Sequence, residues 1–422
     1  MIFIVTRVRK ICIYPNQTQI NKINGILGCC NWIKNKYLEV NIRRYENGKS
    51  FISAYTFSKF INYLKNHYDD FKWINKYSSK AIQDAIMIEE KAYKRFFKKG
   101  EGFPRFKSRK YLNKESYFFI KDSIHYIKKN IIKLPILGKI RITENDYLPD
   151  IESISSGRII REYDKYYVMF IVKEDKYKLD TSSLELGIDV GLKTYATVSS
   201  NYLEPKFIKH FKDIERYKDI DKRIIKLQQI LSHKVEVNYN RLLNKYMDKH
   251  PCEEITDTIK NIMKGESYNS SRIRGIRKKI NRLNRKKQNI RLDFINKLVY
   301  SLTARTKPNM ITIENLVISE MIKHNGSKDT TLHKYIAESG FYTFKEKLMN
   351  KCNYYGINLR LANKYFASSK ICCVCGHKKK DLTLNDRVYH CSKCDNKIDR
   401  DLNASINLLN MKNKDTTMII NA

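Results

Sequence analysis

Residues 372–376 read C-C-V-C-G, residues 391–394 read C-S-K-C, and residues 399–404 read D-R-D-L-N-A. The first two runs are C-x2-C knuckles with fifteen residues between them, a spacing typical of a zinc ribbon. The sequence therefore predicts one structural Zn²⁺ held by four thiolates, those of Cys372, Cys375, Cys391 and Cys394. Cys373 breaks the C-x2-C register, so we expect it to point away from the metal.

Three carboxylates stand beside apolar runs that lie far apart in the sequence. Asp189 interrupts the run at residues 186–191, Glu314 ends a strand-like run that begins at Met310, and Asp401 opens a predicted C-terminal helix. A single acid in a strand usually marks an edge position or a salt bridge. Because the pattern recurs, we instead expect the three acids to converge on one or two divalent cations. Mg²⁺ is favoured because it takes oxygen ligands and keeps positions open for phosphate and water.

The D-R-D run contains two carboxylates, Asp399 and Asp401, and helix geometry predicts different roles for them. If residues 401–410 form a helix, positions i, i+3, i+4 and i+7 share one face. The predicted buried stripe consists of Leu402, Ile406 and Leu409, and the neighbouring stripe consists of Asp401, Ala404, Ser405 and Leu408. The small side chains beside Asp401 would let it approach the strands, whereas Asp399 is expected to cap the helix or to pair with Arg400.

The composition points to a polyanionic partner. The chain has 82 Lys and Arg residues against 44 Asp and Glu residues over 422 residues, a formal charge of +38. Nucleic acid is the usual polyanion that offsets such an excess. No apolar run reaches the roughly eighteen residues of a membrane span, so we expect no membrane association and a cytoplasmic, nucleoid-associated protein. The remaining cysteines lack disulfide spacing and are expected to be reduced.

The hydrophobic pattern changes several times along the chain. Residues 16–99 have helical periodicity, whereas short β-like runs occupy residues 102–176. A strand at residues 2–9 would complete this β module, so that the helices form an insertion in it. The module contains aromatic residues that could stack on unpaired bases, including Tyr117, Phe118, Tyr166 and Tyr167. We expect them to be core residues, and base stacking is the second interpretation.

A strongly basic helix is predicted at residues 272–297. Its apolar stripe is expected to pair with the stripe of residues 211–231 in a helical hairpin. Eight cations occur within fifteen residues without an acid among them: Arg277, Lys278, Lys279, Arg282, Arg285, Lys286, Lys287 and Arg291. A charge run is often only a solvated face, but this density favours phosphate contacts without sequence specificity.

Four runs follow one another in a recognisable order. They are G-I-D-V-G-L-K at residues 187–193, I-T-I-E-N-L at 311–316, S-S-K-x-C-x-x-C-G at 368–376 and D-R-D-L-N-A-S-I-N at 399–407. In order and spacing they resemble the RuvC nuclease and zinc ribbon of the TnpB family, transposon-encoded RNA-guided DNA endonucleases related to compact type V CRISPR effectors. The run G-F-P-R-F-K-S at residues 102–108 extends the resemblance into the N-terminal half.

The resemblance implies a fold class and a domain order. The expected fold is α+β and multidomain, with a β-barrel-like module, an inserted helical bundle, an RNase H-like (RuvC) nuclease domain and a zinc ribbon. The expected domains are residues 1–12 as the first strand of the β-barrel (wedge) module, 13–100 as the helical recognition bundle, 101–180 as the remainder of the module, 181–367 as the nuclease domain with a hairpin at about 208–305, 368–398 as the ribbon and 399–422 as the final nuclease segment and tail.

The resemblance also implies roles for particular residues. Asp189, Glu314 and Asp401 would form the catalytic centre with two Mg²⁺ ions, and Arg387 would steady the scissile phosphate. Lys80 and Gln83, on the helix expected to follow Ser78 or Ser79, would read a short motif next to the DNA target, because Gln pairs bidentately with adenine and Lys with guanine. An exposed polar face is the plain alternative. The implied partners are a guide RNA from the transposon end, double-stranded target DNA and a separate transposase encoded nearby.

Two departures and three alternatives accompany this interpretation. Asp395 follows the second knuckle where family members carry glycine, and the segment at about residues 232–271 is longer than a simple hairpin needs and has no assigned role. A catalytically silent RNA-guided repressor is disfavoured by the complete acidic trio. A small CRISPR effector would differ in gene context, and a strand-joining transposase would yield joined DNA products.

Overall fold

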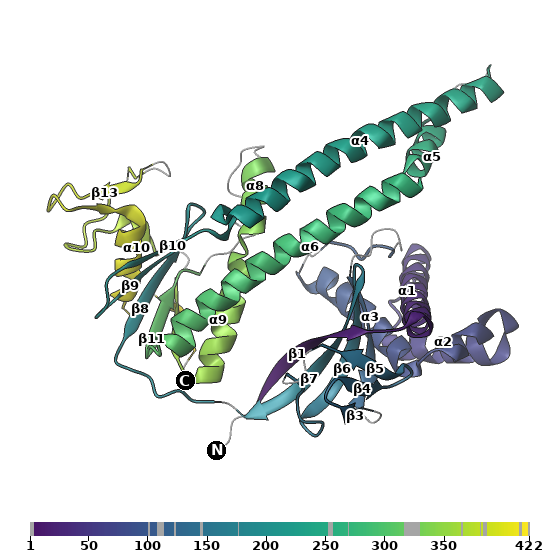
Figure 1. The fold of residues 1–422 in the computed structure, drawn as a ribbon, viewed down its shortest axis with the longest axis horizontal. Helices are drawn as coiled ribbons and strands as arrows, with labels where there is room; N and C mark the ends of the chain where they lie inside the picture. Colours follow the sequence, from purple (N-terminus) through teal and green to yellow (C-terminus); the bar gives the residue numbers. More distant parts are fainter. Residues whose placement is uncertain are drawn as a thin grey trace. The chain divides into compact units, whose positions relative to one another are not determined.

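The computed structural model describes most of the chain in two compact units. It describes residues 4–99, 102–107, 114–121, 124–143, 147–175, 177–251, 256–268, 270–315, 330–363, 366–379, 381–382, 386–412 and 416–420. Unit 1 spans Met1–Asp175 and unit 2 spans Lys176–Ala422. Each unit is described by itself. Figure 1 identifies their helices and strands by label and colour.

Unit 1 contains an antiparallel sheet of seven strands in the order β2-β6-β7-β1-β5-β4-β3. The strands are β1 (Ile4–Tyr14), β2 (Lys114–Ile120), β3 (His125–Lys128), β4 (Ile131–Leu134), β5 (Gly138–Ile142), β6 (Ile154–Glu162) and β7 (Lys165–Asp175). Strand β1 pairs with β7 from Ile4 opposite Asp175 to Ile13 opposite Tyr166. This pairing confirms that the N-terminal strand belongs to the β module, with the helices inserted after it.

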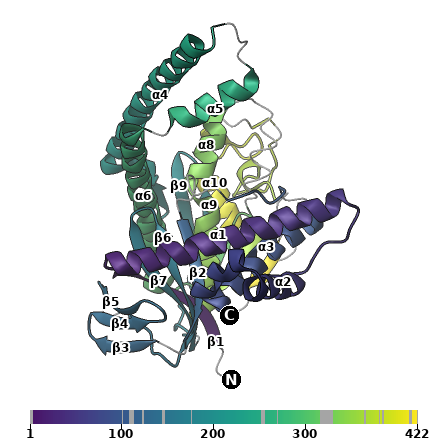
Figure 2. The ribbon, with the colours of Figure 1, turned by 90° about the vertical axis from the view of Figure 1, so that its right-hand side faces the viewer.

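Three helices make up the insertion: α1 (Gln17–Glu46), α2 (Ala54–His67) and α3 (Ser79–Lys99), with the 3₁₀ segment η1 (Asp69–Lys76) before α3. A capping box starts α1, because the Asn16 side chain accepts from the Gln19 N–H at 2.9 Å and the Gln19 side chain accepts from the Asn16 N–H at 3.0 Å. Figure 2 shows α1 running across the strands, where Ile23, Ile26 and Leu27 join the core of the sheet.

Unit 2 is built on a six-stranded mixed sheet in the order β10-β9-β8-β11-β12-β15. The strands are β8 (Glu185–Val190), β9 (Thr194–Ser200), β10 (Lys206–Lys209), β11 (Met310–Ile313), β12 (Asn358–Ala362) and β15 (Thr416–Ile420). The central strands β8, β11 and β12 are parallel, and the others pair antiparallel with their neighbours. Parallel strands are ordinarily buried on both faces, and Ile188, Ile311 and Leu359 are fully buried here.

Helices connect and cover the strands of unit 2. They are α4 (Glu215–Lys249), α5 (Asp257–Ser267), α6 (Ser271–Tyr300), α8 (Thr330–Ser339), α9 (Phe341–Tyr355) and α10 (Arg400–Leu409), with the short segments η4 (Phe211–Asp213), η5 (Ser301–Arg305) and η6 (Ser368–Lys370). Figure 1 shows α4 and α6 as two long helices side by side, with α5 near their upper end, and α4 contacts both α5 and α6. Thus the long segment at residues 232–271 holds the end of α4 and all of α5.

The predicted pairing of the two apolar stripes in this hairpin is confirmed over its middle. Ile220 and Ile224 of α4 pack with Ile280 of α6, and partly buried leucines and isoleucines extend the seam. Phe211 instead joins the core of the sheet, and Ile214 is 41% exposed. Phe211 and Ile214, which begin the predicted stripe, therefore lie outside the seam, because they precede the first residue of α4, Glu215.

The final helix turns the stripe with the small residues toward the sheet, as predicted. Leu402, Ile406 and Leu409 are only half-buried, whereas Ala404, Ser405 and Leu408 are buried. The stripe of large residues is thus less buried than predicted, whereas the prediction that Ala404 and Ser405 let the Asp401 face approach the sheet is confirmed. Asn403 and Asn407 are buried beside them and donate to the Ile371 carbonyl at 2.7 and 2.6 Å. Buried amides of this kind need such partners.

The zinc-ribbon region contains the hairpin of β13 (Val388–His390) and β14 (Lys397–Asp399). Tyr389 is fully buried there, and its hydroxyl donates to the His377 carbonyl at 3.1 Å. The predicted α+β fold class, with helices, sheets and a C-terminal cysteine cluster, is confirmed. Within the described residues, no helix combines the length and hydropathy that a membrane span requires.

Candidate active site

The register of the parallel strands brings two of the three predicted acids together. Ile188 of β8 lies opposite Ile313 of β11, so the next residues, Asp189 and Glu314, are neighbours at the carboxyl ends of adjacent strands. Side chains alternate between the faces of a sheet. Asp189 therefore lies on the same face as Gly187, which is the face that α10 covers.

Helix α10 supplies the third acid, Asp401, in its first turn. Burial and then the charges of Glu314 and Asp401 raise the pKa of Asp189 well above its ordinary value. Burial also raises the pKa of Glu314, opposed by a hydrogen bond that the Ser368 hydroxyl donates to its carboxylate. Three carboxylates that repel one another in partly buried positions form a site that a divalent cation would stabilise.

Asp399 and Asp401 have different environments, as predicted. Asp399 is the N-cap of α10, and its carboxylate accepts from the N–H groups of Asp401 and Leu402, both at 3.0 Å. Asp401 points into the acidic cluster, with its side chain 18% exposed. The two carboxylates of the D-R-D run are therefore a cap and a cluster member.

The structure adds Arg400 to the acidic cluster. Its guanidinium lies 3.4 Å from the Asp401 carboxylate, and its charge lowers the pKa of Asp189 against the larger effect of burial. The arginine that the resemblance implied near this site was Arg387, with the role of steadying the scissile phosphate. The side chain of Arg387 is exposed, and its carbonyl accepts from the Arg400 N–H at 2.8 Å. Arg400 was overlooked although it stands between the two aspartates of D-R-D, and Ser368 was overlooked although it opens the S-S-K run.

Close approach of α10 to the sheet depends on a glycine. A methyl group added at Gly187 would overlap the backbone of Ser405 and Leu409. The Ser199 and Ser405 hydroxyls form a buried hydrogen bond of 2.6 Å across the same contact. These small residues let Asp401 lie beside Asp189, so the glycine of the G-I-D run positions the acidic cluster.

Gly187→Ala is expected to push α10 away from β8 and to separate Asp401 from the other two acids. Overpacking of this kind typically destabilises by about 1–3 kcal/mol, and we expect at least about a tenfold loss of metal-dependent activity. Thermal unfolding and single-turnover cleavage measure the two effects. Gly275→Ala is the control, because a methyl group there meets nothing within 4 Å on α6. Activity of Gly187→Ala equal to that of the parent would show that the close approach is dispensable.

The four predicted zinc cysteines form one cluster. The sulfur atoms of Cys372, Cys375, Cys391 and Cys394 all lie within 4.8 Å of one another. The Cys372–Cys394 and Cys375–Cys391 pairs are 3.6 and 3.5 Å apart. Tetrahedral Zn²⁺ with bonds of about 2.3 Å places its sulfur ligands roughly 3.8 Å apart. The cluster therefore fits a structural zinc ion.

Both knuckles have the same backbone turn despite their different sequences. Gly376 has φ of 72° and Asp395 has φ of 55°, so the aspartate adopts the left-handed conformation that glycine takes after the first knuckle. Its N–H donates to the Cys391 carbonyl at 3.0 Å, as the Gly376 N–H donates to that of Cys372. The aspartate in place of glycine therefore leaves the second turn in the same conformation as the first. Cys373 lies outside the cluster, and its N–H donates to the Asn403 side chain at 2.9 Å.

The predicted nucleic-acid contacts differ in how much they are exposed. Lys80 and Gln83 are exposed one turn apart on α3. On α6, Lys278, Lys279, Arg282 and Lys286 are exposed, whereas Arg277 and Arg285 are half-buried. Lys287 turns inward, with its ammonium 2.5 Å from Asp221 and 3.4 Å from Glu338. The prediction that Lys287 contacts phosphate is wrong, because these carboxylates already neutralise it. Tyr117 is buried, as its core interpretation predicted.

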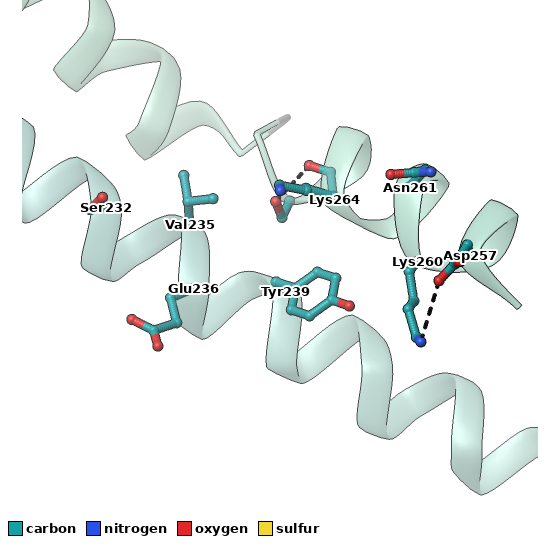
Figure 3. Close-up of a pocket in the computed structure, with 9 residues that line it drawn as sticks. Ser232, Val235, Glu236, Tyr239, Asp257, Lys260, Asn261 and Lys264 are labelled. Atoms are coloured by element: carbon teal, nitrogen blue, oxygen red, sulfur yellow. Dashed lines mark hydrogen bonds and ion pairs between the residues drawn. The ribbon is translucent and has the colours of Figure 1, made fainter. Parts of the chain in front are cut away.

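A cavity of about 640 Å³ lies between α4 and α5 (Figure 3). Glu236 and Tyr239 line it from α4, and Lys260 and Lys264 line it from α5. Lys260 is paired with Asp257 at 3.5 Å. None of the lining residues belongs to the acidic cluster or to the cysteine cluster, so this cavity is separate from both.

Comparison with known proteins gives matches to family models at both ends of the chain. A model described as the TNB domain of Cas12f1-like proteins matches residues 341–408, which include both knuckles and most of α10. A model described as a helix-turn-helix domain of the OrfB IS605 type matches residues 1–50. In the structure, the described part of that region holds strand β1 and helix α1.

Two curated relatives cover almost the whole chain. A protein of Streptomyces pristinaespiralis is 23% identical over 408 residues, 96% of this chain and 89% of its own length. InsQ of Escherichia coli (strain K12) is 23% identical over 413 residues, 95% of this chain and 90% of its own length. Both are provisionally named RNA-guided DNA endonucleases.

Among solved structures, the chain resembles Cas12f1 as seen by cryo-EM in its complex with sgRNA and target DNA. The TM-score is 0.51 at 13% sequence identity, covering 96% of this chain and 98% of that one. At this level of identity the likeness concerns the fold.

Proposed function

Because this chain belongs to the TnpB family, we propose that it is an RNA-guided DNA endonuclease that cuts target DNA beside a short motif read by the protein. The observation that carries the proposal is the meeting of three acids from separate parts of the sequence. Besides burial, the charges of Glu314 and Asp401 raise the pKa of Asp189, and the charge of Asp401 raises that of Glu314, at one end of β8 and β11. Such a site suits hydrolysis of a phosphodiester bond.

In this proposal the three carboxylates would hold two Mg²⁺ ions. When bound, these ions activate water and stabilise the leaving oxygen of the scissile phosphate. The residues around the acids have their own tasks. The Ser368 hydroxyl orients the Glu314 carboxylate, Asp399 fixes the start of α10, and Arg400 offsets part of the negative charge. Arg387, exposed beside the start of α10, stays our proposal for steadying the phosphate.

The proposed partners are a guide RNA and double-stranded target DNA. The charge of +38 supports a polyanionic partner. We assign phosphate contacts to the basic face of α6: Arg277, Lys278, Lys279, Arg282, Arg285 and Lys286. We further propose that the guide derives from the transposon end, that a separate transposase is encoded nearby, and that the protein acts at the nucleoid in the cytoplasm. The domain limits predicted above remain part of this proposal.

The function is tested with the RNA that copurifies with the protein. We expect one RNA species with a variable guide segment, and cleavage only of plasmids that contain the matching target beside a short motif. The experiment sequences the RNA and then reprogrammes the guide. Cutting by RNA-free protein at physiological salt without sequence dependence would indicate an ordinary nuclease. Guided binding without cuts would indicate a repressor, and joined products would indicate a transposase.

Gln83→Ala is expected to change which motif permits cleavage. The exposed amide of Gln83 can donate to and accept from adenine in the major groove, and loss of one bidentate contact costs about 1–3 kcal/mol of discrimination. Cleavage of a plasmid library with a randomised motif measures the preference. The control is Gln17→Ala, which removes an exposed amide at the start of α1 in the same unit. An unchanged motif preference in Gln83→Ala would reject this role.

A further inference from the structure

The run G-F-P-R-F-K at residues 102–107 follows α3 and is fixed to the helices of unit 1. The Asn35 side chain of α1 donates to the Lys107 carbonyl at 3.0 Å and accepts from the Lys107 N–H at 2.7 Å. Pro104 is buried. The Phe103 ring packs edge-to-face against Tyr93 and Phe96, with ring centroids 5.6 and 5.2 Å apart. A two-way backbone clamp and a buried proline hold this run in one conformation.

The clamped run and the end of α3 nevertheless expose aromatic rings. Phe97 is 64% exposed, Phe103 is 45% exposed and Phe106 is 56% exposed. An aromatic ring stabilises a fold chiefly through the area that it buries. The three rings stand on a fixed backbone and leave much of their area in solvent, so they are available to stack on a flat partner such as a nucleotide base.

Cations surround these rings. Arg105 is exposed between Phe103 and Phe106, and the last turns of α3 expose Lys94 and Lys98. A hollow of about 400 Å³ on this part of α3 is lined by Ile88 and four cations: Lys91, Lys94, Arg95 and Lys98. Aromatic rings interleaved with cations are the usual composition of a site for single-stranded nucleic acid, since bases stack on the rings while the cations contact phosphates.

The same face of α3 connects this site with the proposed motif reader. Exposed residues recur at helical spacing along the helix: Lys80, Gln83, Met87, Lys94 and Phe97. Gln83 and Phe97 are separated by about 21 Å at roughly 1.5 Å per residue. That is the length of about six base pairs of B-DNA. A duplex whose motif is read at Gln83 must open within a few base pairs if a guide is to pair with it.

We propose that Phe97, Phe103 and Phe106 form a stacking site for unpaired nucleotides of the target DNA where the duplex opens next to the motif. Arg105, Lys94 and Lys98 contact the phosphates of the same strand. This inference rests on the proposed function and adds a partner to it. The displaced DNA strand is the occupant because the site lies on the face of α3 assigned to the DNA motif. Stacking of this kind needs no particular base.

The test places 2-aminopurine at successive positions of the target DNA next to the motif. Full-length protein with its copurified RNA binds these duplexes, with Asp401→Asn as the background so that the DNA stays intact. Stacking on an aromatic ring quenches 2-aminopurine fluorescence. We expect quenching at one or two positions in the parent complex. We expect loss of that quenching, and at least about fivefold weaker binding of the target, in Phe106→Ala.

Three variants separate stacking from other roles. Phe106→Tyr keeps the ring and is expected to keep the quenching, whereas Phe106→Leu keeps an apolar side chain and is expected to lose it. Tyr55→Ala is the matched control, since Tyr55 is 71% exposed on α2. Guided binding with quenching unchanged in Phe106→Ala and Phe97→Ala would overturn the inference. The inference would also be overturned if these substitutions changed the quenching only when 2-aminopurine is placed in the guide RNA and not in the target DNA. Absence of guided DNA binding in the parent would instead overturn the proposed function.

Discussion

Asp401→Asn is expected to abolish DNA cleavage, with a fall of at least about 10³-fold in the single-turnover rate, while guided DNA binding is retained. Asp401 faces Asp189 and Glu314 from the first turn of α10. Loss of one ligand charge weakens the hold on the metal that stabilises the developing charge, a contribution of several kcal/mol. The same result is expected of Asp189→Asn and Glu314→Gln.

Asp399→Asn is the matched control, two residues away in the same run. Its carboxylate caps α10 by accepting from two backbone N–H groups, and asparagine caps a helix about as well as aspartate does. We therefore expect stability and cleavage close to those of the parent. The comparison uses one guide, one target and saturating Mg²⁺. The opposite ranking, with Asp399→Asn inactive and Asp401→Asn active, would overturn the assignment of the acidic cluster.

Cys375→Ser is expected to release the zinc and to unfold the ribbon. The cluster buries little apolar surface of its own, chiefly Tyr389 with two of the cysteines. Structural zinc contributes roughly 10–16 kcal/mol in small domains of this kind. The Ile371 carbonyl, which accepts from Asn403 and Asn407 of α10, belongs to the same region. Loss of zinc should therefore also loosen α10 and reduce cleavage by at least about tenfold.

Cys373→Ser is the control that distinguishes loss of a zinc ligand from loss of a cysteine that does not bind the metal. The Cys373 thiol lies outside the cluster, and only its backbone N–H is used in the contact with Asn403. We expect about one equivalent of zinc per chain in the parent and in Cys373→Ser, and none in Cys375→Ser, as measured by elemental analysis of purified protein. Equal zinc loss in the two variants would contradict the ligand assignment.

Several features of the site could be predicted because they depend on local spacing. The C-x2-C knuckles place two sulfur atoms on one tight turn wherever they occur, so four ligands and the exclusion of Cys373 followed from the sequence. The role of Asp399 was also local, because a cap bonds to N–H groups two and three residues further on. The acids that end β8 and β11 were recognised because a carboxylate beside an apolar strand is unusual unless it has a partner or a function.

Other predictions failed where a side chain is paired with a residue far away in the sequence. Lys287 belongs to a dense basic run, but Asp221 and Glu338 lie 66 and 51 residues away in the chain and neutralise it. Arg400 was overlooked, although its guanidinium lies beside the acids; Arg387 stays the proposal for steadying the phosphate. Leu402, Ile406 and Leu409 of α10 were expected to be a buried stripe, but they are only half-buried because the neighbouring small-residue face is the one against the sheet.

The sequence by itself indicated the four clustered cysteines, the change from helical to β-like segments in the N-terminal half, the three acids and a polyanionic partner, since these depend on residue type and spacing along the chain. Only the tertiary structure decided how the acids meet. The register of β8 and β11 sets Asp189 beside Glu314, and Gly187 lets α10 come close enough to add Asp401. Both depend on which backbones lie against each other in space, and that contact joins segments more than two hundred residues apart.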